Sequence, residues 1–381
     1  MKQRLGRIDA PLFLIVIALT IFGVIMVFSA SYYATIANNL SPYYYLERSS
    51  MWAAAGVVVM LIVSAVPTSF YLRIAPFAMT IAILLLLVLF TQLGISVNGA
   101  RRWIGVGSLT FMPGEFAKLA AILFVAWYYT KYAKQTKTLM YGIVPMLILI
   151  GVLFMLIYKE PNLSTAIIVV LTILFMMFLA GVRLGYLIVL IVIGALGVYA
   201  MVQSSGGEHL TRISGYLDPF SDAQGSFYQT VQGLIALGNG GLTGSGLGDS
   251  VGAALWLPEA QNDFIFAVIG EETGFVGCIL LLIGFLVLIW RCMLISMRAQ
   301  SRFDMLLGGG VTAVMALQVI LNIGVVTNLL PPTGVTLPFI SYGGNAILLF
   351  MVLMGIMLHI SRKDPARTAA QAERRRREDA A

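Results

Sequence analysis

Apolar segments of about 20 residues follow one another along almost the whole chain, and no other feature restricts the possible folds as strongly. The first of them, "PLFLIVIALTIFGVIMVFSAS", contains no charged residue. A helix needs about 20 apolar residues to cross a bilayer, and it satisfies its own backbone hydrogen bonds there. Only 11% of the 381 residues are charged, whereas soluble domains carry about 25%. The sequence therefore predicts an all-α integral membrane protein.

Charged stretches and stretches rich in Gly or Pro separate the apolar segments. We predict ten transmembrane helices, near residues 11–31, 51–67, 73–94, 115–131, 140–158, 163–181, 184–203, 263–290, 305–328 and 342–361. The first apolar run is longer than the core of a cleaved signal peptide, which has about 7 to 15 residues, so we expect it to be retained. Residues 11–361 then form one membrane domain, between a short N-terminus (1–10) and a basic tail (362–381).

An even number of spans places both termini on one side, and the positive charges indicate that this side is the cytoplasm. With this orientation, most Lys and Arg residues outside the spans are cytoplasmic. The exceptions, on or near the outer side, are Arg48, Arg101, Arg102, Lys118, Lys159 and Arg212. We therefore predict a multi-pass protein of the cytoplasmic membrane. The tail 362–381, which contains "ERRRRED", contributes +3 of the net charge of +7, and we interpret it as a solvated segment next to membrane lipid and not as a site for nucleic acid.

Residues 204–262 form the one large loop, on the extracytoplasmic side. A loop of this length is usually functional or disordered. Apolar residues from Tyr228 to Leu237 predict a short helix that folds back onto the membrane domain. The Gly-rich stretch "GNGGLTGSGLG" lacks the Lys-Ser/Thr ending and the preceding strand of a phosphate loop, so we interpret it as a flexible hinge.

Asp263 is the strongest candidate for chemistry, because it opens the eighth span and ionisable groups inside a membrane are costly. Glu259 precedes it by four residues. If both are helical, their repulsion raises one of the two pKa values, as a general base near neutral pH requires. The alternative is that Asp263 only caps the helix. Glu271 and Glu272 lie further along at other angles around the helix, and we expect them to pair with neighbouring helices.

A basic group precedes the fourth span. Arg101, Arg102 and Lys118 lie near the outer leaflet, against the positive-inside bias, which suggests an anionic ligand. The planar guanidinium of Arg matches phosphate especially well. The alternative is an internal salt bridge from one of the arginines to Glu115 or Glu160.

A second unusual segment, "NLLPPTGVTLPFISYGGNA", is uncharged and rich in Pro and Gly. It cannot form a regular helix, and irregular backbone at membrane depth is tolerated only where it lines a cavity or packs on protein. We therefore expect it to form part of a pocket wall. The two His and two Cys residues assemble into no metal site and no Ser-His-Asp arrangement.

These motifs, with "YKEPNLSTA", "DPFSDAQGSFYQTVQGLIALGNGGLTGSGLG" and "LPEAQNDFIFAVIGEETGF", resemble the SEDS family of peptidoglycan polymerases (shape, elongation, division and sporulation) over nearly all of residues 10–360. "LPPTG" and "LPEAQNDF" are more similar to the cell-division branch than to the elongation branch. The resemblance implies ten transmembrane helices and a glycosyltransferase that polymerises lipid II into glycan strands outside the cytoplasmic membrane. The family's catalytic Asp falls on Asp263. Gly114, "AQND" and "GGNA" depart from the usual family residues, which leaves the fine specificity open.

The resemblance also implies partners: lipid II, the nascent glycan, a class B penicillin-binding protein that crosslinks the product, and other division proteins. Asp263 is then the general base, and undecaprenyl pyrophosphate is the leaving group. The residues that we assign to substrate or pyrophosphate binding are Arg101, Arg102, Glu115, Lys118, Glu160, Tyr228, Gln229, Gln232, Glu259, Ser341 and Tyr342.

No cofactor is required by the sequence, although a divalent cation, Mg or Mn, could neutralise the leaving group. Two alternative functions stay open. One is a lipid II flippase or other membrane transporter, since buried acids also serve proton relays. The other is a scaffold for division proteins. The clustering of polar residues at the outer face favours the enzyme.

Overall fold

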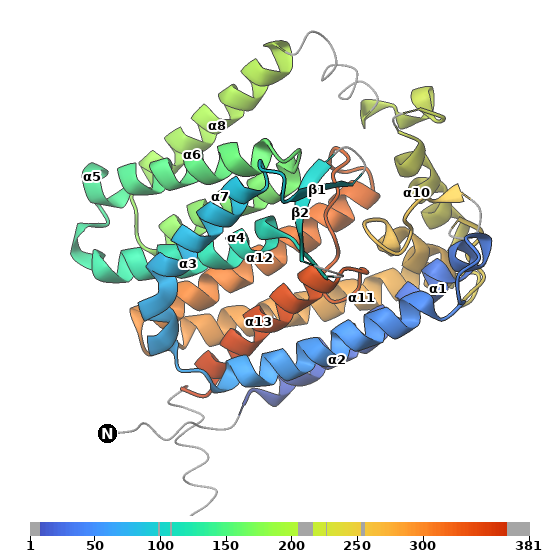
Figure 1. Cartoon of the computed structure of the whole chain (residues 1–381), viewed down its shortest axis with the longest axis horizontal. Coiled ribbons are helices and arrows are strands. Elements are labelled where there is room, and N and C mark those ends of the chain that lie inside the picture. Colours follow the sequence, from blue (N-terminus) through green and yellow to red (C-terminus); the bar gives the residue numbers. More distant parts are fainter. Residues whose placement is uncertain are drawn as a thin grey trace, which may run out of the picture.

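The computed structural model describes residues 8–97, 100–106, 109–204, 216–225, 227–252 and 256–363. Predictions for residues 1–7, for 205–215 of the large loop and for the tail from 364 onward lie outside the described residues. The helices are α1 (Ala10–Ala37), α2 (Tyr44–Ala65), α3 (Thr68–Val88), α4 (Pro113–Lys131), α5 (Leu139–Gly142), α6 (Val144–Tyr158), α7 (Leu163–Leu179), α8 (Leu184–Ser204), α10 (Tyr228–Asn239), α11 (Ile265–Met297), α12 (Arg302–Val326) and α13 (Gly344–Ser361) (Figure 1).

Each predicted span overlaps one of these helices, and the protein is a helical membrane protein. Seven helical segments in the described part of the chain are long and apolar enough to cross a membrane. The helix at Leu163–Leu179 and the start of α8 are apolar but shorter, so the number of ten spans stays a prediction. The predicted boundaries were wrong at α1, which continues to Ala37, and at α2, which begins at Tyr44. Polar and aromatic residues extend both helices beyond the apolar runs.

Three of the described helices begin at a residue whose side chain caps them. Asp9 accepts a hydrogen bond from the Leu12 backbone N–H at 3.0 Å and so caps α1. Asn162 caps α7 and Ser301 caps α12 through their side chains in the same way. Such caps satisfy backbone N–H groups that a helix leaves free at its start.

A small sheet corrects the prediction of a purely α-helical chain. The antiparallel strands β1 (Gly94–Val97), β2 (Ala100–Val106) and β3 (Leu109–Phe111) form a three-stranded sheet in the order β1-β2-β3. From the sequence we place this segment in an outer loop between the third and fourth spans and assign no strand to it. The Asn-Gly pair in "ISVNGARRW", a sequence signal for a hairpin, could have indicated the sheet.

Helix α11 is broken inside the bundle at Gly274, whose φ of 68° and ψ of −169° are not helical. A break leaves backbone groups without helical partners, which is costly at membrane depth. The Gly-rich segment 241–246 supplies the partners. Ser245 and Gly246 donate their N–H groups to the carbonyls of Glu271 and Glu272 at 2.9 and 3.1 Å. In the structure this segment is therefore docked on α11, not a free hinge.

Two residues that precede the break, Glu271 and Glu272, are the acids that follow Asp263. Glu272 accepts a hydrogen bond from the Ser29 hydroxyl of α1 at 2.6 Å, as expected for a pair with a neighbouring helix. Glu271 instead accepts from the large loop, through the Ser250 hydroxyl and the Gly252 N–H. Both carboxylates are buried, and they tie α1 and the large loop to α11.

The two ends of the described chain meet at the same end of the bundle. The Asp9 N–H donates to the Ser361 hydroxyl at 3.2 Å, and Arg291 forms a salt bridge with Asp9 at 3.0 Å. Lys363 forms another with Asp304 at 3.1 Å. Helix α10 lies at the opposite end (Figure 1).

Candidate functional site

Asp263 lies in an irregular turn, residues 258–264, that leads into α11. The N-cap of α11 is Phe264, without a side-chain cap hydrogen bond, so Asp263 does not occupy the capping position. Nor are Glu259 and Asp263 on one helix face, because Glu259 has a left-handed φ of 49°. A non-Gly residue in this region carries backbone strain, which tends to occur at functional sites.

The surroundings of Asp263 change its acidity in the direction that general-base chemistry needs. Burial raises the pKa of the half-buried Asp263 carboxyl to about 6. The charge of Arg102 lowers this pKa, and the charge of Glu259 raises it. The expected repulsion between Glu259 and Asp263 is therefore present, although burial is the larger cause. Glu259 itself is exposed and accepts a hydrogen bond from the Asn262 amide at 2.7 Å.

Arg102 is directed toward this turn by an irregularity in the sheet. Ile95 pairs with Trp103 and Ser96 pairs with Arg101, which leaves Arg102 as the extra residue of a β-bulge. Bulges re-aim side chains and are frequent next to active sites. The Arg102 guanidinium donates to the backbone carbonyls of Glu160 and Pro161. Arg101 is exposed, so the structure separates the two arginines.

Glu160 lies beside Arg102 at the turn between α6 and α7. Its side chain is buried, and neither carboxylate oxygen has a hydrogen-bond partner among the described residues. Burial raises the pKa of Glu160 to about 8, against the opposing charge of Arg102. Burial also lowers the pKa of Arg102, whereas the charges of Asp263 and Glu160 raise it. At neutral pH a largely protonated Glu160 leaves part of the Arg102 charge available to another anion.

Glu115 and Lys118 form a buried ion pair on α4, with 2.8 Å between Glu115 Oε1 and Lys118 Nζ. Lys118 is 1% exposed and also donates to the Gln318 side chain at 2.9 Å. The internal salt bridge considered for Glu115 is thus present, but with Lys118 and not with an arginine. This geometry places Lys118 within the protein core.

Sequence reasoning missed two polar residues of α12, Gln318 and Asn322. Asn322 donates to the Asp263 carbonyl at 2.7 Å and to the Val335 carbonyl at 2.6 Å. Gln318, one helical turn earlier, donates to the carbonyl and hydroxyl of Thr336, at 3.2 Å each. Two amides four residues apart in the apolar "QVILNIGVV" were the available signal, because uncompensated polar groups are costly inside a membrane.

The proline- and glycine-rich segment 327–343 is irregular, as predicted, and borders Asp263. A Cβ atom added at Gly334 would lie 2.9 Å from Asp263 Oδ2. Tyr342 donates its backbone N–H to the Gln261 carbonyl at 2.9 Å, and its ring packs edge-on against Tyr45 with 4.8 Å between centroids. The segment therefore forms one wall beside the Asp263 turn.

The remaining candidates differ in their environment. Gln229 of α10 donates to the Pro258 carbonyl at 3.0 Å, so it supports the turn that carries Asp263. Tyr228 and Gln232 are half-buried on the same helix. Ser341 is buried, and its hydroxyl accepts from the Leu337 N–H at 2.7 Å. Ser341 therefore closes a turn of the irregular segment.

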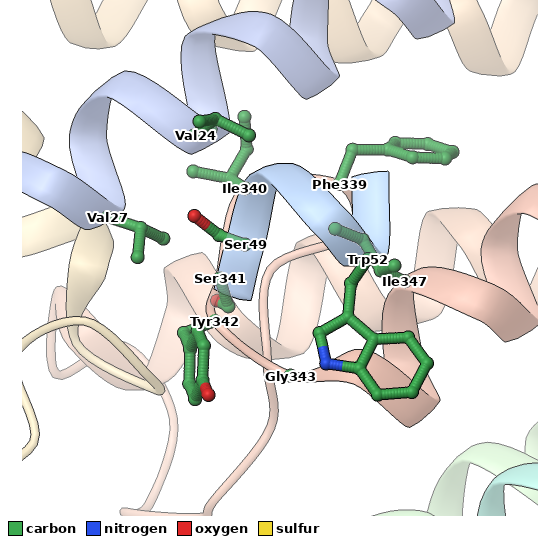
Figure 2. A pocket seen from close by; sticks show the side chains of 12 residues that line it. Val24, Val27, Ser49, Trp52, Phe339, Ile340, Ser341, Tyr342, Gly343 and Ile347 are labelled. Carbon is green, nitrogen blue, oxygen red and sulfur yellow. The ribbon is translucent and has the colours of Figure 1, made fainter. Parts of the chain in front are cut away.

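A small apolar pocket lies between α1, α2 and the irregular segment, and Asp263 is not among the residues that line it. Figure 2 shows Ser341 and Tyr342 in its wall, beside Trp52 of α2. Val24 and Val27 of α1 face the same space. The pocket connects the C-terminal half of α1 and the N-terminal half of α2 with the segment that borders Asp263.

A divalent cation is the one cofactor that the sequence leaves open. Among the described residues, no group of three or more His, Cys, Asp or Glu side chains could hold a metal ion. We therefore assign no step to a divalent cation.

Comparison with known proteins supports a single family. The family model described as Cell cycle protein, FTSW_RODA_SPOVE, matches residues 9–365. Stage V sporulation protein E of Bacillus subtilis (strain 168) is 38% identical over 355 residues, which cover 93% of this chain and 97% of that protein. A probable peptidoglycan glycosyltransferase FtsW of Trichlorobacter lovleyi is 37% identical over 360 residues, 94% of each chain.

Two solved structures share the fold. A chain from a peptidoglycan synthase complex that coordinates polymerization and crosslinking superimposes with a TM-score of 0.78. The rod shape determining protein RodA of Thermus thermophilus superimposes with a TM-score of 0.66. Each alignment covers 94% of this chain and 98% of the other at 24% identity.

Proposed function

Because this chain belongs to the cell cycle protein family of FtsW, RodA and SpoVE, we propose that it is a peptidoglycan glycosyltransferase. It polymerises lipid II at the outer face of the cytoplasmic membrane, with Asp263 as the general base. The observation that carries this proposal is the half-buried Asp263 carboxyl, with a pKa raised to about 6 and the Arg102 charge beside it. A base is most effective when its pKa lies near the working pH.

In the proposed reaction, the 4-hydroxyl of one lipid-linked disaccharide attacks the anomeric carbon of the growing chain. The new glycosidic bond forms as the bond to the pyrophosphate oxygen breaks, with inversion at that carbon. Asp263 accepts the hydroxyl proton, and undecaprenyl pyrophosphate leaves as an anion. Because the leaving group is already ionised, the reaction needs no protein acid on that side, unlike an inverting glycosidase.

The cations have different tasks in this scheme. Arg102 is half-buried and close enough to Asp263 to influence its pKa, which suits it to bind the pyrophosphate through its planar fork. Arg101 is exposed and suits the approach of the lipid-linked phosphates. Lys118 is held by Glu115 and Gln318. We therefore assign it a structural role, through Gln318, and not direct contact with the leaving group.

The fold and its relatives also suggest a place in the cell. We assign ten spans with both termini in the cytoplasm, and a class B penicillin-binding protein as the partner that crosslinks the glycan. The peptidoglycan synthase complex among the structural neighbours supports such a partner. Similarity to a probable FtsW supports a role in cell division, and similarity to stage V sporulation protein E supports one in sporulation. Of the two we propose division, with other division proteins and lipid II as further partners.

The test is polymerisation of lipid II by the purified protein, alone and with a candidate class B partner. Asp263→Asn removes the basic carboxylate and should lower glycan synthesis by about 100-fold or more, the usual contribution of general-base catalysis. Asp218→Asn is the matched control, because it makes the same change at an exposed acid of the large loop and should retain activity. Full polymerisation by the Asp263 variant refutes the assignment. Lipid II transport without polymerisation supports the transporter instead.

A further inference from the structure

Asn322 is buried in α12, where the N–H groups of an amide are costly unless they are hydrogen-bonded. The residue is 1% exposed, and its neighbours in "QVILNIGVV" are almost all apolar. Nothing in the helix itself requires a polar side chain there. The amide must therefore be explained by what it contacts.

Both hydrogens of the amide are used, and they reach two segments that lie apart in the sequence. One goes to the carbonyl of Asp263 at 2.7 Å, and the other goes to the carbonyl of Val335 at 2.6 Å. Neither segment has regular structure at these positions. A side-chain amide thus replaces the backbone partners that a helix or sheet would supply.

The two segments meet at the Asp263 carboxyl. Gly334 directly precedes Val335, and a Cβ at Gly334 would lie 2.9 Å from Asp263 Oδ2. The two hydrogen bonds that Asn322 donates therefore join the turn that carries the carboxyl to this wall. A reacting group that is misplaced by about 1 Å can lose about 100-fold in rate.

We propose that Asn322 is a positioning residue for glycosyl transfer, which holds the Asp263 turn and the Val335 segment in register. The proposal rests on the proposed function of Asp263. Gln318 reinforces it, because it binds Thr336, the next residue of the same segment, and links it to Lys118. Asn322 does not itself contact the substrate in this scheme.

Two variants separate the hydrogen bonds from the volume of the side chain. Asn322→Leu has nearly the same size and no donor, and Asn322→Asp has the same shape but loses its donors when ionised. Both should lower kcat for lipid II polymerisation by about 100-fold, with KM little changed because the substrate contacts remain. If Asn322→Leu polymerises at the wild-type rate, the hydrogen bonds are not needed and the proposal is wrong.

Thr312→Val is the matched control. Thr312 is also buried in α12, and its hydroxyl bonds only to the Gly308 carbonyl of the same helix, at 2.8 Å. This variant removes a buried polar group from the same helix and should retain kcat. Thermal unfolding of each purified variant shows whether a loss of activity reflects a loss of folding.

A second measurement reports the position of the turn without using activity. Asp263→Cys is labelled in membranes with an impermeant maleimide, alone and combined with Asn322→Leu. The native Cys278 and Cys292 are buried, so they contribute little background. We expect several-fold faster labelling in the double variant, because the released turn exposes residue 263. Equal labelling rates contradict the positioning role even if Asn322→Leu fails to fold in detergent.

The outcomes separate this proposal from the proposed function. If Asp263→Asn polymerises lipid II, the catalytic assignment fails, whereas the labelling result still decides whether Asn322 holds the turn. The other outcome is that Asp263→Asn is inactive, that Asn322→Leu is active, and that Asp263→Cys is labelled at the same rate with and without Asn322→Leu. In that case only the positioning proposal fails.

Discussion

At the scale of single residues, the acidity of Asp263 is the balance of burial and two opposite charges. Burial and Glu259 favour the protonated form, and Arg102 favours the carboxylate. A base with a pKa of about 6 is mostly ionised at pH 7, yet it is a stronger proton acceptor than an ordinary aspartate. The same three effects make the pH dependence of the reaction predictable.

We expect kcat/KM of the wild-type protein to fall below about pH 6, because protonation of Asp263 removes the base. Glu259→Gln removes a charge that raises this pKa, so the fall should move to lower pH. Arg102→Gln removes the charge that lowers it, so the fall should move to higher pH, by about one unit. Initial rates of lipid II polymerisation between about pH 4.5 and 8 measure both shifts.

Movement of both profiles in the same direction would contradict this electrostatic account. Arg102→Gln should also lower the maximal rate, since Arg102 is assigned to binding the leaving group. The midpoint of the pH profile reports the pKa of Asp263, and the plateau of the profile reports the maximal rate, so the two effects are measured separately. An unshifted profile in the Asp218→Asn control would show that distant acids do not contribute.

At the scale of elements, the break in α11 joins the membrane helices to the large loop. Gly241 and Leu242 accept hydrogen bonds from the N–H groups of Phe275 and Val276 at 2.9 and 3.1 Å. Ser245 and Gly246 complete the other side of the break. The loop is thereby fixed to the helix whose first residues follow Asp263. The site is built on this junction and not on a free loop.

Gly274→Ala should destabilise the protein by about 1–3 kcal/mol, the cost of a backbone conformation that only glycine adopts readily. A Cβ at this position would also lie 2.6 Å from the Leu242 carbonyl oxygen. The measurement is thermal unfolding in detergent. Gly151→Ala in α6 is the control, since a Cβ there meets nothing within 4 Å and alanine favours a helix. Equal stability of the two variants would show that the break is not needed.

At the scale of the whole molecule, the bundle has two chemically different ends. One end holds Asp9, Arg291, Asp304 and Lys363 in salt bridges beside both ends of the described chain. The other holds the Asp263 turn, with α10 packed against it. An enzyme that works on one side of a membrane needs this asymmetry, whereas a carrier needs polar groups reachable from both sides.

Cysteine labelling in intact cells tests the orientation. Leu217→Cys, at an exposed position of the large loop, should react with an impermeant thiol reagent from outside. Lys137→Cys, exposed between α4 and α5, should react only after the membrane is opened. The reverse pattern would place the site in the cytoplasm and would contradict the proposed use of lipid II at the outer face.

The sequence alone determined the membrane class and the approximate positions of the helices, and it singled out Asp263 as the candidate base. Hydrophobic transfer energy adds up residue by residue, so a long apolar run is enough to predict a span. An acidic residue at the boundary of such a run is unusual and is therefore easy to recognise. The pairing of β1 with β2 also has a local signal, the Asn-Gly pair, although the prediction from the sequence assigned no strand there.

The tertiary structure alone decided which polar groups meet. Lys118 and Gln318 are 200 residues apart in the chain, and Asn322 and Asp263 are 59 apart. A hydrogen bond depends on position within a few tenths of an ångström, and that position follows from how whole helices pack. Local sequence therefore marks Asn322 as costly, but only the assembled bundle shows that it holds the turn of Asp263.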